Sequence, residues 1–166
     1  MNGCVSVIMG SKSDLDVVKP CLKTLKNFGV KTQTHVLSAH RTPEQVASAA
    51  SQAKKNGVEV IIGVAGKAAA LAGVLAGHTS LPVIGLPVAT SMMGGLDSLL
   101  STVQMPSGVP VATVAVNGGE NAALLAVRIL SVKYPELAEK LDAHREVMRA
   151  KTLEDDAALE KELENL

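Results

Sequence analysis

The hydrophobic positions of the chain fall into short apolar runs that alternate with segments of helical spacing. Apolar runs without polar alternation are typical of parallel strands covered on both faces. They predict strands at residues 4–9, 58–64, 83–86 and 111–116. Residues 31–37 alternate polar and apolar side chains, which predicts a further strand nearer the sheet edge. Residues 58–64 are richer in β-branched residues and are expected to be central.

Helices are predicted between these strands, each after a turn of small or polar residues. Apolar spacing places them near residues 15–28, 42–56, 68–76, 96–103 and 121–132. Thr42, Pro43 and Gln45 are start signals for the second of them: a cap, a first-turn proline and a glutamine three residues on. The pattern predicts an α/β protein, a three-layer α/β/α flavodoxin-like domain with a five-stranded parallel sheet in the order 2-1-3-4-5.

Residues 135–166 are expected to form a C-terminal helical extension beyond an α/β domain of residues 1–134. An apolar stripe continues along this segment, formed by Leu137, Leu141, His144, Met148, Leu153, Leu159 and Leu163. A solvated, frayed tail would not need such spacing, so the helix is expected to dock on a neighbouring subunit. The alternative is such a tail.

Composition narrows the classes of ligand. Aromatic residues make up only 1% of the 166 residues, which removes base stacking and argues against single-stranded nucleic-acid binding. Net charge is zero, but residues 1–135 hold 11 Lys and Arg against 6 Asp and Glu, which suits a small anionic ligand. Cys4 and Cys21 lack metal-ligand spacing and fit a reducing compartment. No membrane span or signal peptide is visible in the sequence, so a cytoplasmic protein is expected.

Residues 38–43 (SAHRTP) are the first candidate site, because they follow a predicted strand. In an open parallel sheet, ligands bind beside the carboxyl ends of the strands. His40 can transfer protons near neutral pH, and Arg41 can hold a phosphate. The alternative is that Thr42 and Pro43 only begin a helix, while His40 and Arg41 are solvated turn residues.

Two other turns after strands have similar properties. Gly10, Ser11, Ser13 and Asp14 offer small side chains and backbone N–H groups at a helix start, which suits phosphate, although neither the Walker loop nor the dinucleotide fingerprint is matched. Ser13 or Asp14 could instead serve only as a helix cap.

The third such turn holds Gly66 and Lys67 among small residues, so backbone could approach a ligand and Lys67 could face an anion. Close packing of helix on sheet is the alternative. No Ser/His/Asp order, CxxC, HExxH or acidic metal cluster is present in the sequence. Chemistry would therefore depend on one histidine, hydrogen-bonding loops and the reactivity of the substrate, with no metal.

Four segments together resemble one family, the 5-(carboxyamino)imidazole ribonucleotide mutases of purine biosynthesis (PurE). They are residues 9–14 (MGSKSD), 38–43 (SAHRTP), 104–111 (QMPSGVPV) and 121–126 (NAALLA). The likeness extends to about residue 150. It implies a flavodoxin-like homo-octamer without metal, ATP or organic cofactor, which moves a carboxylate from the exocyclic nitrogen to ring carbon 4 of a small ribonucleotide. Family members are thought to release CO₂ in a closed site and recapture it.

The resemblance also implies residue roles. Ser11 and Arg41 would bind the phosphate side of the nucleotide, Asp14 the ribose hydroxyls, and His40 would be the general acid and base. The remaining substrate-binding residues would be Gly10, Ser13, Ser38, Gly66 and Lys67.

The third turn departs from the family pattern. Ala70 and Ala72 replace a usual His and Pro, and Lys67 replaces a usual Gly or apolar residue. A second class in the family carboxylates aminoimidazole ribonucleotide directly with CO₂. Its members tend to lack the His at the position of Ala70 and to carry a basic residue near the position of Lys67. They typically have Lys instead of Arg after the histidine that corresponds to His40. Arg41 favours the mutase. The alternatives are a direct carboxylase, a non-catalytic nucleotide-binding homologue and a carboxylase that acts on another nucleotide. Residues 104–110, which keep the family pattern, argue against the last of these.

Overall fold

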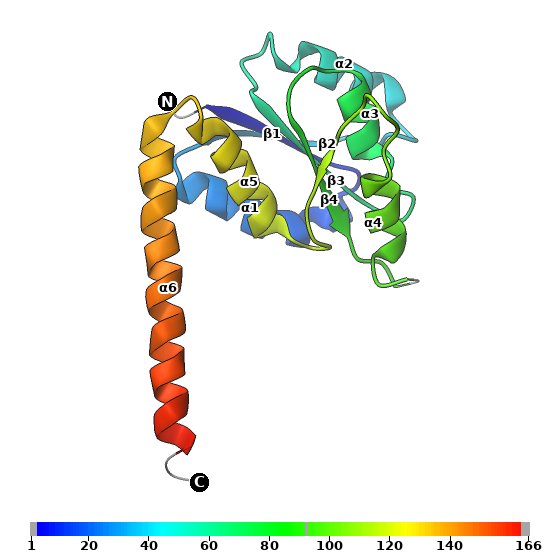
Figure 1. Cartoon of the computed structure of the whole chain (residues 1–166). Helices are drawn as coiled ribbons and strands as arrows, with labels where there is room; N and C mark the ends of the chain where they lie inside the picture. The colour runs from blue at the N-terminus through cyan, green and yellow to red at the C-terminus, as the bar shows by residue number, and fades with distance from the viewer. Residues whose placement is uncertain (1–2, 92, 164–166) are drawn as a thin grey trace.

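A single parallel sheet forms the centre of the molecule, in a computed structural model that describes residues 3–91 and 93–163. Its strands are β1 (Cys4–Met9), β2 (Lys31–Val36), β3 (Val60–Gly66), β4 (Val83–Val88) and β5 (Ala112–Thr113). Their order is β2-β1-β3-β4-β5, all parallel (Figure 1). The predicted flavodoxin-like order is confirmed, with β3 central and the alternating strand β2 at an edge.

Helices cover both faces of the sheet (Figure 1). One face is covered by α1 (Leu15–Asn27) and α5 (Gly119–Ser131), and the other by α2 (Pro43–Ala53) and α3 (Leu71–Gly77). A short 3₁₀ helix, η1 (Lys12–Asp14), precedes α1. The remaining helix of the body, α4 (Leu96–Val103), packs near β4 and β5. Successive side chains of a strand point to opposite faces. Accordingly Val7 of β1 belongs to the core under α1 and α5, whereas Ile8 belongs to the core under α2 and α3.

Both cysteines lie in the hydrophobic core. Cys4 and Cys21 are free and buried. Burial raises the pKa of the Cys21 thiol to about 12 and also raises the pKa of Cys4. Because the thiolate is the reactive form, both thiols remain protonated and inert at neutral pH.

The last strand is shorter than predicted, since β5 contains only Ala112 and Thr113 instead of residues 111–116. Val114 N donates to Gly85 O at 3.0 Å, but the next bond to β4 runs from Asn117 N to Pro87 O at 2.9 Å. Between these two hydrogen bonds the chain after β5 advances three residues, from 114 to 117, while β4 advances two, from Gly85 to Pro87. The extra residue interrupts the hydrogen-bond ladder between the strands. Asn117 accommodates the change with a φ of +58°.

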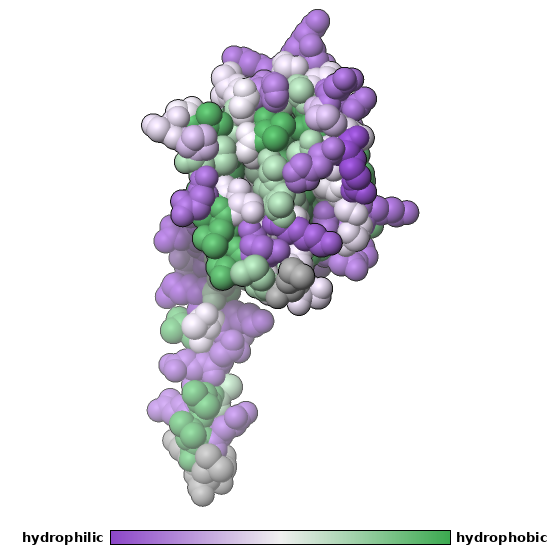
Figure 2. All heavy atoms as spheres, turned by 90° about the vertical axis from the view of Figure 1, so that its right-hand side faces the viewer, coloured by the Kyte–Doolittle hydropathy of each residue, from purple (hydrophilic) through white to green (hydrophobic). Residues whose placement is uncertain are grey.

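The C-terminal helix α6 (Pro135–Leu163) packs on the body only at its start and then projects away from it (Figure 1). Leu137 and Leu141 are buried, and the His144 ring meets Phe28 edge-on at 5.8 Å between centroids. Farther along, apolar side chains are exposed on the free part of the helix (Figure 2). Residues 1–2 of the predicted domain and 164–166 of the predicted extension lie outside the described residues.

Among the described helices, including the long α6, none is both long and apolar enough to cross a membrane.

Candidate active site

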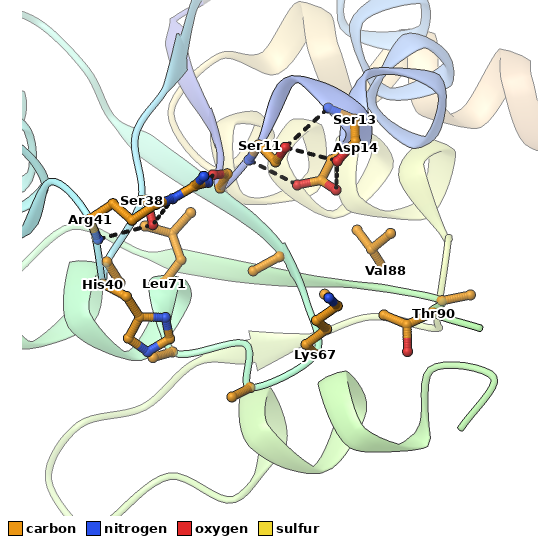
Figure 3. A pocket seen from close by; sticks show the side chains of 17 residues that line it. Ser11, Ser13, Asp14, Ser38, His40, Arg41, Lys67, Leu71, Val88 and Thr90 are labelled. Atoms are coloured by element: carbon orange, nitrogen blue, oxygen red, sulfur yellow. Dashed lines mark hydrogen bonds between the residues drawn. The ribbon is translucent and has the colours of Figure 1, made fainter. Parts of the chain in front are cut away.

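A cavity of about 700 Å³ opens at the carboxyl edge of the sheet. The loops that follow β1, β2, β3 and β4 form its walls (Figure 3). All nine residues predicted from the sequence to bind or act on a ligand line it: Gly10, Ser11, Ser13, Asp14, Ser38, His40, Arg41, Gly66 and Lys67. Three turns far apart in sequence are thus brought to one place.

The first wall is a turn held together by its own polar side chains. Ser11 N donates to Asp14 Oδ2 at 3.1 Å, while Ser13 N and Ser13 Oγ donate to Ser11 Oγ at 3.2 and 2.8 Å. Ser11 is the N-cap of η1 and forms a capping box with Asp14, whose carboxylate accepts from Ser11 N. Asp14 is also the N-cap residue of α1, as the alternative expected, but its side chain makes no capping bond to that helix. This turn is therefore shaped before any ligand binds.

Asp14 has an unusual environment for a carboxylate at a turn. It is only 9% exposed. Burial raises the pKa of its carboxyl above the ordinary aspartate value, and the hydrogen bonds from Ser11 and Ser13 offset this only in part. Desolvation penalises the charged form, so a carboxylate here gains from donors that a ligand could bring.

The second wall is closed by Thr42 in a way that the sequence did not predict. Its Oγ1 accepts from Ser38 N at 2.9 Å and donates to Ser38 O at 3.1 Å. The predicted side-chain cap on α2 is therefore wrong, because this hydroxyl is committed to the preceding turn. The five-residue loop from Ser38 to Thr42 is pinned at its ends, and His40 lies exposed between them.

Arg41 joins the first two walls. Its Nη2 donates to Gly10 O at 3.0 Å, and its Nε donates to Ser38 Oγ at 3.4 Å. Figure 3 shows this side chain reaching toward the Ser11 turn, with the His40 ring on another part of the rim. Within residues 3–91 and 93–163 no hydrogen-bond partner of the His40 ring is found, so both ring nitrogens are open to a ligand.

The third wall follows β3. Gly66 lies against the fourth loop, because a Cβ on it would come 3.1 Å from Thr90 Cγ2. Lys67 comes next with a φ of +57°, a left-handed conformation that few non-glycine residues adopt. Ala70 and Leu71 complete this wall.

The fourth wall, formed by Val88 at the end of β4 with Ala89 and Thr90 after it, was missed by the sequence analysis. Ala89 N donates to Asn117 Oδ1 at 2.9 Å, and Thr90 Oγ1 donates to Asp97 Oδ2 at 3.2 Å. None of these three side chains suggests chemistry by itself. Their place after a strand at the same sheet edge was the signal that could have found them.

The cavity combines a polar side with an apolar side. Serines, Asp14 and Arg41 form one part, and small apolar residues of the third and fourth loops form another. In the part of the chain that the structure describes, no group of three or more His, Cys, Asp or Glu side chains could hold a metal ion. The arrangement suits a small anion beside a histidine that can transfer a proton.

Comparison with known proteins assigns the chain to a family. The model of the AIR carboxylase family matches residues 4–151. The chain belongs to the AIR carboxylase family. Within this family, the N5-carboxyaminoimidazole ribonucleotide mutase of Saccharolobus solfataricus is 56% identical over 145 residues, 87% of this chain and 92% of the relative. The protein of the same name from Aquifex aeolicus is 52% identical over 99% of both chains.

A solved member of the AIR carboxylase family has the same fold. The crystal structure of PurE from Treponema denticola superposes with a TM-score of 0.86 at 33% identity, covering 94% of this chain and 98% of that one. This agreement confirms the flavodoxin-like prediction across nearly the whole chain.

Two of the four family-like segments lie away from the cavity of this AIR carboxylase family member. Residues 104–111 contribute none of its lining residues; Met105 packs instead against Gly73 of α3, where a Cβ would come 3.0 Å from its sulfur. Residues 121–126 belong to α5 on the face of α1. Segments that resemble a family thus need not touch the cavity of their own chain.

Proposed function

We propose that this protein is an N5-carboxyaminoimidazole ribonucleotide mutase, in which His40 is the general acid and base. One observation carries the proposal: a single cavity gathers all nine predicted residues in a chain 56% identical, over 145 residues, to a relative that bears this name. The substrate is a small ribonucleotide, and the reaction needs no metal, ATP or organic cofactor.

The substrate lies with its phosphate toward the first two loops. Ser11 and Arg41 bind the phosphate side, where the turn supplies hydroxyls and the guanidinium supplies charge. Asp14 accepts hydrogen bonds from the ribose hydroxyls, which offset the desolvation of its carboxylate. Gly10, Ser13 and Ser38 complete this side, and Gly66 and Lys67 line the side that receives the base.

His40 carries one proton through the reaction. Protonation of the exocyclic nitrogen by His40 breaks the N–C bond of the carbamate, leaving its electron pair on nitrogen and releasing CO₂. Ring carbon 4 then attacks CO₂, and the new C–C bond leaves a proton on carbon 4 that neutral His40 removes. The imidazole is thereby returned to its starting state. Retention of CO₂ beside carbon 4 is a proximity effect.

The test is an assay of both candidate substrates on one purified preparation. The protein is expected to convert 5-(carboxyamino)imidazole ribonucleotide into the carbon-linked carboxylate without ATP or added bicarbonate. Turnover of aminoimidazole ribonucleotide that depends strictly on added bicarbonate would instead identify a direct carboxylase, which Lys67 and Ala70 in the third loop favour as the second candidate. A protein that binds the nucleotides but converts neither would be a non-catalytic homologue.

The C-terminal extension, residues 135–166, is proposed to dock on a neighbouring subunit of a homo-oligomer, an octamer by the family resemblance. The support is the set of exposed apolar side chains along α6 beyond its buried start: Val147, Met148, Leu153, Leu159 and Leu163. Residues 1–134 would then be the nucleotide-binding and catalytic domain. The proposed site of action is the cytoplasm, whose reducing conditions suit two free thiols.

Removal of residues 151–166 is expected to shift the protein from a large assembly to smaller species in sedimentation-velocity experiments. The cut leaves the buried residues Leu137 and Leu141 in place, so the melting temperature of the dilute subunit should change little. A matched control replaces only charged residues of the same stretch, for example Glu154→Gln. A full-length chain that sediments as a monomer would contradict the docking proposal.

A further inference from the structure

Lys67 is the cavity residue with the least ordinary backbone. Its φ of +57° lies in the left-handed region, which glycine adopts freely and a lysine rarely does. The residue stands directly after β3, between Gly66 and the loop that leads to α3. From this position its side chain extends from the loop into the cavity, in the direction of the Asp14 turn (Figure 3).

The ammonium group of Lys67 is available to a ligand. Among the described residues it has neither a hydrogen-bond acceptor nor an ion-pair partner, in contrast to Arg41, which donates to Gly10 and Ser38. Asp14 lines the same cavity, but its carboxylate accepts from Ser11 and Ser13. Lys67 therefore contributes a positive charge that forms no ion pair with any described residue.

Apolar residues line the cavity together with Lys67: Ala68, which follows it in the chain, Ala70 and Val88. Thr90 adds no polar group here, because its hydroxyl donates to Asp97 and its methyl group faces Gly66. A bound ligand would cover the exposed ammonium and exclude water, which strengthens its attraction for an anionic group.

We propose that Lys67 holds the carboxylate that migrates, and so determines the specificity of the cavity for carboxylated nucleotides. This inference rests on the proposed function. Such a substrate carries two anionic groups, and the cavity offers two basic side chains on separate loops, Arg41 at the phosphate side and Lys67 after β3. The ammonium binds the carbamate before CO₂ leaves and the carbon-linked carboxylate after it is captured, while the proton passes through His40 as described.

The test compares two ligands by isothermal titration calorimetry: 5-aminoimidazole ribonucleotide and its 4-carboxylate. In Lys67→Met the affinity for the carboxylate is expected to fall roughly tenfold, the size of one charge-assisted hydrogen bond, while the affinity for the uncarboxylated nucleotide stays within about twofold. Lys67→Arg should keep the preference. Lys67→Gly, which suits the left-handed backbone, should lose it as Lys67→Met does, which separates the charge from folding effects.

Arg41→Met and Lys23→Met are the controls. Arg41→Met should weaken both ligands alike, since both carry the phosphate, and Lys23 lies exposed on α1 outside the cavity, so its replacement should change neither affinity. Equal losses for the two ligands in Lys67→Met, or no loss for either, would overturn the role of Lys67 while leaving the mutase proposal intact. A wild-type protein that binds neither nucleotide would overturn both.

Discussion

Replacement of His40 by asparagine is expected to lower kcat by about 100- to 10,000-fold, because a positioned acid and base contributes a factor of this order and no second histidine lines the cavity in the described chain. Asparagine keeps a polar side chain of similar size but cannot exchange a proton near neutral pH. The affinity for nucleotide should stay within a few-fold of wild type, because the Ser11 turn and Arg41 are untouched. Steady-state kinetics and calorimetry measure the two effects separately.

His35→Asn is the matched control for this experiment. His35 lies exposed on β2, five positions earlier in the chain, and does not line the cavity. Its replacement should leave kcat unchanged. If His40→Asn retained a kcat within about tenfold of wild type, the loss would be too small for an acid and base, and His40 would not be the proton carrier. A parallel collapse of nucleotide affinity would point to a binding role instead.

Replacement of Asp14 by asparagine is expected to weaken nucleotide binding by about 100-fold without lowering stability. Two hydrogen bonds from ribose hydroxyls to a carboxylate together strengthen binding by about 100-fold, and an amide oxygen is a much weaker acceptor. The fold should tolerate the change, since the amide oxygen can still accept from Ser11 N. The melting temperature is expected to fall by no more than about 2 °C, which for a chain of this size corresponds to at most about 1 kcal/mol.

The raised pKa of Asp14 also predicts how the stability of Asp14→Asn relative to wild type changes with pH. Burial raises the pKa of the native Asp14 carboxyl, so the native state keeps that proton to a higher pH than the unfolded chain does. In the pH range between the two pKa values, the free energy of unfolding therefore falls as pH rises, and at neutral pH the ionised carboxylate opposes folding. Denaturant titrations should show the stability of Asp14→Asn relative to wild type rising across that range.

Asp16→Asn is the control for the carboxylate. Asp16 is exposed and forms an ion pair with Lys19 at 2.7 Å, and the pKa of its carboxyl is lowered by that hydrogen bond. Its replacement should leave binding unchanged and shift stability in the opposite direction with pH. An Asp14→Asn protein that binds nucleotide as tightly as wild type would contradict the ribose role.

Most of the fold could be predicted because its signals are local. The buried run CVSVIM and the polar alternation of residues 31–37 differ visibly, and they correspond to an inner strand and an edge strand. The end of β5 could not be predicted, because it depends on how residues 114–117 fit against Gly85 and Pro87 of another strand. Apolar composition alone continues the strand through that point.

The site was predictable where side chains carry recognisable chemistry. His40, Arg41 and Asp14 stand out after strands, whereas Val88 and Ala89 do not. The role of Thr42 could not be predicted either, because a threonine before a proline predicts a helix cap. Only the folded loop shows that the Thr42 hydroxyl is hydrogen-bonded to the backbone N and O of Ser38. The same limit applies to Lys67, whose backbone conformation cannot be read from its neighbours.

The placement of α5 and α6 has a consequence for folding during synthesis. Every cavity residue lies between Gly10 and Thr90. The sheet face behind them is covered later, by residues such as Ala122 and Leu137 in the same core as Val7 of β1. A nascent chain that ends after β4 thus holds the complete set of ligand contacts on a sheet whose one face is covered by α1 alone. Because a domain folds as a unit, we expect competence to bind nucleotide only once α5 and α6 have also emerged.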